Sequence, residues 1–139
     1  MVNISTMRIF LSIVFVFLAN ISFSSPSDTL IEALVHVESK GNAHARGDNG
    51  RAIGILQIHK EVIDDVNKAY GVAYKYADRK NPIKSREICR KYLVLHGGWG
   101  ATNETYARIW NGGPNGHKKY STRGYWLRVK SHLGTKYWT

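Results

Sequence analysis

The sequence predicts a mainly helical α+β domain with about five short helices and one small β-hairpin. Apolar residues recur at helical spacing in several short stretches, and Gly and Pro residues separate these stretches. Between the first two stretches, Asn49-Gly50 marks a tight turn. The chain has 139 residues, of which 43% are hydrophobic, so it can bury one core and one folded domain is expected.

The beginning of the chain differs from the remainder. Arg8 precedes an uncharged apolar run over residues 9–19, which ends near the small residues Ser22 and Ser24. This is the layout of a secretory signal peptide, and the run is too short for a comfortable membrane span. The sequence therefore predicts a signal peptide over residues 1–25, with an uncleaved N-terminal anchor as the alternative, and a folded domain over residues 26–139.

The first helix is expected over residues 27–40, with Ser27 or Asp28 as its N-terminal cap. Asn49-Gly50 favours a type I′ turn, because both residues tolerate positive φ. This turn predicts an irregular β-hairpin within residues 42–58.

The remaining helices are expected from their apolar spacing and from the Gly and Pro residues that bound them. They cover residues 60–70, 85–96, 102–110 and 122–133. Residues 111–116 are rich in Gly and Pro and are expected to lack regular structure.

The chain is strongly basic, with 20 Lys and Arg residues, 10 Asp and Glu residues and a net charge of +10. A basic surface favours polyanions such as nucleic acid, anionic lipid or cell wall. Because the charges are scattered and form no nucleic-acid motif, nucleic acid is not expected as a partner. An exported protein meets the cell wall first, although the charge could also serve solubility alone.

The single cysteine, Cys89, cannot form an intramolecular disulfide and is expected to be a small buried hydrophobe. The six histidines lack a zinc-binding spacing. Neither a metal nor another cofactor is expected.

Glu38 is the first candidate for chemistry. It lies one helical turn after Leu34 and Val35, so its carboxyl is expected at the end of the apolar stripe. Burial raises the pKa of a carboxyl, and a carboxyl that stays protonated near neutral pH can donate a proton to a leaving oxygen. Cleavage of a glycosidic bond needs this step, whereas a solvated glutamate at a helix end is the alternative.

Several motifs in order carry a family resemblance. They are Glu38-Ser39, Gly54-Ile55-Leu56-Gln57, the run from Ala107 to Pro114, and Tyr125. Their order and spacing resemble the lysozyme-like superfamily, in particular the soluble lytic transglycosylase (SLT) domain. The segment from Tyr106 to Gly116 is also similar to invertebrate-type lysozymes, but those proteins are rich in cysteine and this chain has only Cys89.

The resemblance implies a lysozyme-like fold, with a glycan cleft between the hairpin and the helices, and a catalytic acid at Glu38. It implies substrate-binding roles for four further residues: Ser39 supporting the site by hydrogen bonding, Gln57 and Asn111 lining the cleft, and Tyr125 beside the acid. Trp110 stands where transglycosylases usually carry Tyr, which keeps an aromatic wall.

A second carboxylate would decide the type of reaction. Asp48 follows Glu38 by ten residues, at a distance similar to that of the second catalytic acid of invertebrate-type lysozymes, but Asp48-Asn49-Gly50 is also a good turn sequence. Glu61, Asp64 and Asp65 are weaker candidates. In transglycosylases the 6-hydroxyl of the sugar attacks instead, so the sequence leaves both reactions open.

The expected function is cleavage of the β-1,4 bond between N-acetylmuramic acid and N-acetylglucosamine by an exported monomer. Its partners are the glycan strands of peptidoglycan, in the periplasm, cell wall or extracellular space. Two alternatives remain, a non-catalytic wall-binding module of the same fold and a basic protein that permeabilises membranes by charge.

Overall fold

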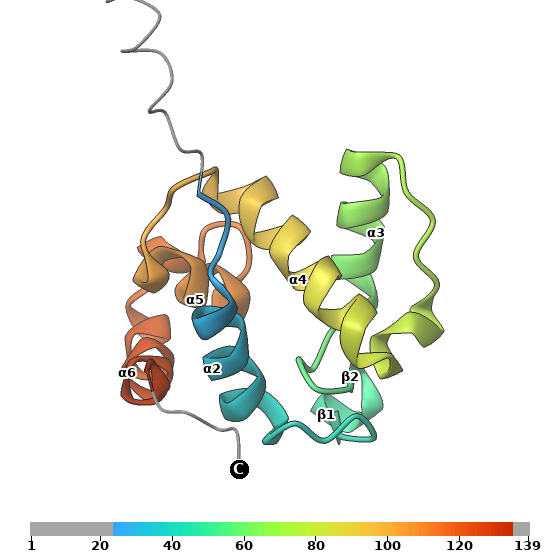
Figure 1. Ribbon diagram of the computed structural model, residues 1–139, viewed down its shortest axis with the longest axis horizontal. Helices are drawn as coiled ribbons and strands as arrows, with labels where there is room; N and C mark the ends of the chain where they lie inside the picture. Colours follow the sequence, from blue (N-terminus) through green and yellow to red (C-terminus); the bar gives the residue numbers. More distant parts are fainter. Residues whose placement is uncertain (1–23, 135–139) are drawn as a thin grey trace, which may run out of the picture.

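The computed structural model describes residues 24–134, and the signal peptide predicted over residues 1–25 lies almost wholly outside this part. The described chain folds into five α-helices and one two-stranded hairpin, which confirms the mainly helical α+β class (Figure 1). The elements are α2 (Asp28–Ser39), β1 (Arg46–Gly47), β2 (Ala52–Ile53), α3 (Lys60–Tyr70), α4 (Pro82–Gly97), α5 (Asn103–Gly112) and α6 (Arg123–His132). Short 3-10 turns are η1 (Asp48–Gly50), η2 (Tyr76–Lys80), η3 (Gly116–Lys118) and η4 (Tyr120–Thr122). Among residues 24–134, no helix is both long and apolar enough to cross a membrane.

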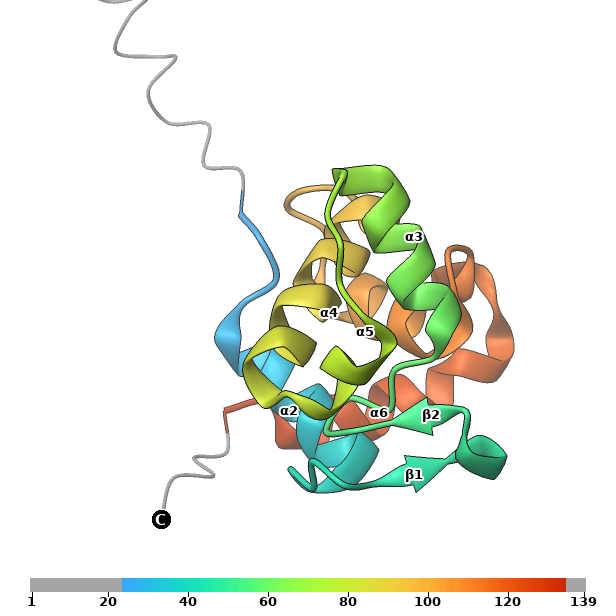
Figure 2. The ribbon, with the colours of Figure 1, turned by 90° about the vertical axis from the view of Figure 1, so that its right-hand side faces the viewer.

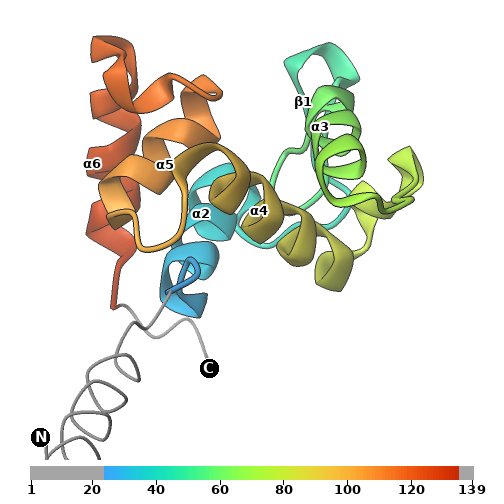
Figure 3. The same ribbon diagram turned by 90° about the horizontal axis from the view of Figure 1, so that it is seen from above.

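Helix α2 supplies the centre of the core. Its residues Leu30, Ile31 and Leu34 repeat at helical spacing and are fully buried. The helix contacts α4, α5 and α6. Figure 3 shows α2 and α4 in the middle, with α5 and α6 on one side and α3 and the hairpin on the other. Because α2 is central, its C-terminal end lies between the α5–α6 pair and the group formed by α3 and the hairpin.

The ends of α2 follow from its capping residues. The Ser27 hydroxyl accepts a hydrogen bond from the Leu30 N–H at 3.2 Å, which satisfies a free donor of the first turn. At the other end, Lys40 takes a left-handed conformation with φ of 54°. Both predicted boundaries, 27 and 40, are thus the caps of the helix.

Figure 2 shows the hairpin along the lower edge of the domain. It is antiparallel, with Arg46 opposite Ile53 and Gly47 opposite Ala52. The predicted turn at Asn49-Gly50 is confirmed, because the two residues have φ of 55° and 85° and the Arg51 N–H donates to the Asp48 carbonyl at 3.2 Å. Asp48 also has a positive φ, 53°, and the ladder therefore stops at Gly47.

Two predicted helix boundaries were wrong. Helix α4 begins at Pro82 instead of residue 85, because the Asn81 side chain caps the N–H groups of Ile83 and Lys84 at 3.0 Å each. Helix α5 continues through Gly112, although residues 111–116 were expected to be irregular. The helix ends only where Gly113 takes φ of 83°. The helix predicted over residues 60–70 is confirmed as α3.

The hairpin is fixed to η2 by a close backbone contact. Gly54 has φ of 82°, and a Cβ atom at this position would lie 2.0 Å from the Arg79 carbonyl oxygen. The Arg79 side chain is 8% exposed. Its guanidinium donates to the carbonyls of Arg51 and Ile58 at 3.0 Å and to that of Tyr76 at 2.8 Å. The absence of a side chain at Gly54 therefore allows the backbone of η2 to pack directly against it.

We expect Gly54→Ala to lower the free energy of unfolding by about 2 kcal/mol or more, because the new methyl group meets fixed backbone and the residue keeps a strained φ. Gly50→Ala is the matched control, since its φ is 85° but no atom lies within 4 Å of the added Cβ. It should cost about 1 kcal/mol. Urea denaturation of both variants measures the difference, and equal losses would contradict the role assigned to the contact.

Candidate active site

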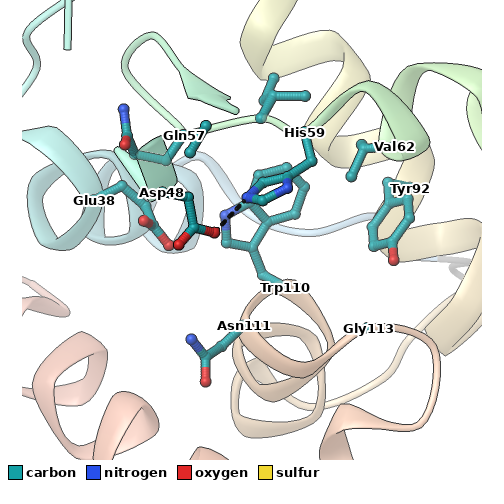
Figure 4. Close-up of a pocket in the computed structure, with 11 residues that line it drawn as sticks. Glu38, Asp48, Gln57, His59, Val62, Tyr92, Trp110, Asn111 and Gly113 are labelled. Carbon is teal, nitrogen blue, oxygen red and sulfur yellow. Dashed lines mark ion pairs between the residues drawn. The ribbon is translucent and has the colours of Figure 1, made fainter. Parts of the chain in front are cut away.

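A cleft of about 510 Å³ lies between the hairpin, α3 and α5. Figure 4 shows the side chains that line it. They are Glu38, Asp48, Ala52, Gln57, Ile58, His59, Val62, Tyr92, Trp110, Asn111 and Gly113. These residues come from α2, the hairpin, α3, α4 and α5, so the cleft exists only in the folded chain.

Glu38 lies in the last turn of α2 and is half-buried. The Tyr125 hydroxyl, from α6, donates to Glu38 Oε1 at 2.6 Å. Tyr125 is 5% exposed and does not line the cleft, so it holds the carboxyl from behind. With Oε1 engaged in this way, Oε2 is the oxygen free to carry a proton toward the cleft.

Burial raises the pKa of Glu38 above its ordinary value of 4.5, because the charged form loses solvation. The hydrogen bond from Tyr125 and the positive charge of Arg128 both act to lower this pKa, and desolvation outweighs them. Burial also raises the pKa of Tyr125 well above 10.0, so the phenol keeps its proton and remains a donor. The pair therefore favours a protonated carboxylic acid at the cleft.

The side chains of Ser39 and Gln57 both bond to the backbone of the segment that follows β2. The Ser39 hydroxyl donates to the Ile55 carbonyl at 2.8 Å, which ties the end of α2 to the segment after β2. Gln57 Nε2 donates to the Gly54 carbonyl at 2.9 Å. Gln57 lines the cleft, whereas Ser39 is not among the lining residues.

Asp48 enters the cleft from the hairpin turn. Its Oδ2 lies 3.0 Å from Nε2 of His59, and Figure 4 marks this ion pair. His59 is the N-terminal cap residue of α3. The side chains of Asp48 and His59 are 58% and 34% exposed, so water reaches both. The cleft thus contains two carboxyl groups in different surroundings, one half-buried behind Tyr125 and one solvated beside a histidine.

Aromatic side chains form the opposite wall. Trp110 and Tyr92 both line the cleft, and their rings meet edge to face with centroids 5.7 Å apart. Asn111 follows Trp110 in α5 and is exposed in the cleft. Because α5 continues through Asn111, the position of this amide is set by a helix and not by a loop. Such aromatic and amide groups can contact sugar faces, hydroxyls and acetamido groups.

No group of three or more His, Cys, Asp or Glu side chains within residues 24–134 could hold a metal ion. Cys89 is fully buried, and burial raises the pKa of its thiol well above 9.0. It packs as the small hydrophobe that the sequence indicated.

The structure brings four of the predicted site residues into the cleft, and it places Ser39 and Tyr125 behind it. The four that line it are Glu38, Asp48, Gln57 and Asn111. Of the weaker acidic candidates, Asp64 accepts from the Tyr76 hydroxyl at 2.9 Å and Asp65 pairs with His96 at 3.3 Å, and neither lines the cleft. Three further lining residues, His59, Val62 and Tyr92, were not predicted from the sequence. They come from α3, its N-terminal cap and α4, and only the tertiary fold brings them to the same cleft as Glu38.

The family of this chain follows from a comparison of its sequence with known protein families. The sequence matches the family described as the Transglycosylase SLT domain over residues 18–132. The chain belongs to the SLT domain family. The match includes α2 with Glu38, the hairpin and Tyr125 in α6, and it confirms the predicted resemblance. No curated protein matches this chain in sequence.

Solved structures agree on the fold of this SLT domain. It is similar to the Tapes japonica lysozyme, with 23% identity, a TM-score of 0.67 and coverage of 83% of this chain and 99% of that chain. A chain in the crystal structure of Aeromonas hydrophila PliI in complex with Meretrix lusoria lysozyme is also similar, with 24% identity and a TM-score of 0.66. It covers 79% of this chain and 93% of that chain. The predicted lysozyme-like fold is confirmed.

We expect Glu38→Gln to increase the free energy of unfolding at pH 7 and to lose this advantage as the pH falls below about 4.5. Between 4.5 and the raised pKa, native Glu38 holds a proton that the unfolded chain releases, so the wild-type protein loses stability as the pH rises. Gln has no charge to desolvate. Urea unfolding across this pH range measures the difference.

The exposed Glu61→Gln is the matched control for the loss of one negative charge. A stability difference between wild type and Glu38→Gln that does not vary with pH would contradict the argument.

Proposed function

We propose that this SLT domain cleaves the glycan strands of peptidoglycan at the β-1,4 bond between N-acetylmuramic acid and N-acetylglucosamine, with Glu38 as the general acid. The observation that carries the proposal is the Glu38 carboxyl, which faces the cleft while burial raises its pKa and Tyr125 orients it. A glycosidic oxygen is a poor leaving group until it is protonated, and a neutral carboxylic acid at this position can supply the proton.

The reaction begins with a glycan strand in the cleft, against Trp110 and Tyr92 on one side and the hairpin on the other. Glu38 donates its proton to the bridging oxygen while the bond from this oxygen to the sugar C1 breaks. The positive charge that develops on the sugar ring is stabilised by the carboxylate that Glu38 becomes. Gln57 and Asn111 contact the sugar, while Ser39 and Tyr125 keep Glu38 and the hairpin in position.

The reaction can be completed in two ways that differ at Asp48. In hydrolysis, Asp48 removes a proton from a water molecule that attacks C1, or stabilises the charged sugar directly. In transglycosylation, the 6-hydroxyl of the same sugar attacks C1 and gives its proton to the Glu38 carboxylate, which restores the acid and leaves a 1,6-anhydro end. Support for the first comes from Asp48 lining the same cleft as Glu38, and support for the second from the family to which the chain belongs.

The site of action that we propose is outside the cytoplasm, in the periplasm, the cell wall or the extracellular space. The SLT family acts on peptidoglycan, and this polymer is extracytoplasmic. The net charge of +10 favours association with an anionic wall. The predicted signal peptide over residues 1–25 is consistent with export.

Product analysis tests the proposal. Purified peptidoglycan treated with the protein should release soluble muropeptides, and Glu38→Gln should lower the rate by about 10²-fold or more, because the general acid is lost. Mass spectrometry of the products separates 1,6-anhydro ends from reducing ends. Glu87→Gln removes an exposed carboxylate on α4 outside the cleft and should cleave at the wild-type rate. Absence of products from the wild-type protein, together with retained wall binding, would favour the non-catalytic binding module.

Asp48→Asn separates the two ways of completing the reaction. Asn tolerates the positive φ of this position, so the turn should be kept. If water attacks, the variant should lose about 10²-fold in kcat, because the second carboxylate is gone. If the 6-hydroxyl attacks, the loss should stay below about tenfold. Asp65→Asn, outside the cleft, is the control. A large loss with anhydro products would contradict this division of roles.

A further inference from the structure

A second, smaller cavity lies beside the hairpin and the start of α3. It has a volume of about 280 Å³ and is lined by Gly50, Arg51, Lys60, Glu61 and Arg79. Three of these five residues are cationic, and one is acidic. Their neighbours in the chain, Ala52 and His59, line the cleft, so the two cavities share the hairpin and the start of α3 as a wall.

Arg79 is the unusual member of this group. Its side chain is 8% exposed, and within residues 24–134 it forms no ion pair with a carboxylate. Its Nε and Nη1 atoms donate to backbone carbonyls, and no bond within the described chain uses Nη2. The exposed Glu61 acts on Arg79 electrostatically but forms no ion pair with it. A buried cation that lacks an ion pair is costly, and the cavity beside it gives an anion access.

Further positive charge surrounds this cavity. Burial lowers the pKa of Arg79, and the positive charge of Arg46 acts in the same direction, while Glu61 and Tyr76 act to raise this pKa and only partly offset the two. Two of the cations make cation–π contacts with the ring of Tyr76. Lys60 Nζ lies 4.9 Å and the guanidinium carbon of Arg79 lies 5.9 Å from the centroid of this ring, so the contacts hold both charges in place. Glu61 is the one negative side chain at the cavity, and its side chain is 84% exposed.

We propose that Arg51, Lys60 and Arg79 form a binding site for an anionic oxygen group of the wall polymer, a phosphate or a carboxylate. The Nη2 group of Arg79 provides the unused N–H donors of the buried guanidinium, and the exposed Arg51 and Lys60 provide further positive charge at the cavity. The site lies next to the cleft but outside it, so it would hold the polymer while a glycan strand is bound by the cleft.

The first test is a titration of the full protein with inorganic phosphate, followed by NMR of the backbone amides and the Arg side-chain N–H groups. Saturable shifts should centre on Gly50, Arg51 and Arg79. The double variant Arg51→Gln/Lys60→Gln should weaken phosphate binding by about three- to tenfold, since each exposed charge contributes modestly. Arg79 is left intact because its bonds also support the hairpin.

Two further variants sharpen this test. Lys68→Gln/Lys130→Gln removes two exposed charges that line neither cavity and should leave phosphate binding unchanged. Glu61→Gln removes the one negative side chain and should strengthen phosphate binding. Phosphate shifts that are spread over the surface, or equal losses in both double variants, would overturn the proposal.

A second experiment identifies the source of the anion. Glu38→Gln protein is sedimented with peptidoglycan that keeps its phosphate polymers, or with peptidoglycan stripped of them, so that binding is measured without cleavage. If phosphate is the ligand, Arg51→Gln/Lys60→Gln should reduce binding only to the first material. If stem-peptide carboxylates are the ligand, the reduction should be equal on both. No reduction on either material would overturn the assignment to the wall polymer, whatever the outcome of the cleavage assay.

Discussion

The site depends on one interaction at the edge of the core, the hydrogen bond from Tyr125 in α6 to Glu38 in α2. A general acid must be desolvated enough to keep its proton and must still point at the substrate, and these two demands conflict in an ordinary core. A phenol resolves the conflict because it orients the carboxyl without adding a charge. Burial keeps this phenol protonated, so the donor persists through the pH range in which Glu38 titrates.

The second constraint is the attachment of a very short hairpin. Two residue pairs cannot stabilise a β-ladder in isolation, so the hairpin relies on contacts outside itself. Ser39 holds it from the end of α2, and Arg79 holds it from η2, with Gly54 in direct backbone contact. Because Ser39 follows Glu38, the same helix end positions the acid and the cleft wall opposite it. This coupling fixes the position of Glu38 relative to the hairpin.

Local patterns in the sequence predict much of this fold. Apolar spacing identified α2 and α3, and Asn49-Gly50 identified the turn, because these features depend on neighbouring residues. The end of α5 was wrong because a Gly-rich segment can continue a helix when tertiary packing supports it. Glu38 could be identified as a candidate from its place on the apolar stripe of its helix. The pairing of Asp48 with His59 and the contact of Tyr92 with Trp110 could not be predicted, because they join residues from different elements. The cavity lined by Arg51, Lys60 and Arg79 was not predictable either, because Arg79 lies far from Arg51 in the sequence and reaches it only after η2 packs on the hairpin.

The arrangement of charge about the hairpin follows from the chemistry of the acid. A cation beside Glu38 would favour its ionised form and lower its pKa, as Arg128 already does to a limited extent. Under the proposed function, a strongly basic protein that acts on an anionic polymer must therefore keep most of its cations away from Glu38. Along the chain, Ala52 lines the cleft while the preceding Arg51 lines the cation cavity, and His59 and Lys60 divide in the same way. Adjacent residues thus separate the proposed binding site for the polymer from the proposed proton donor, so the positive charge of that binding site does not favour the ionised form of Glu38.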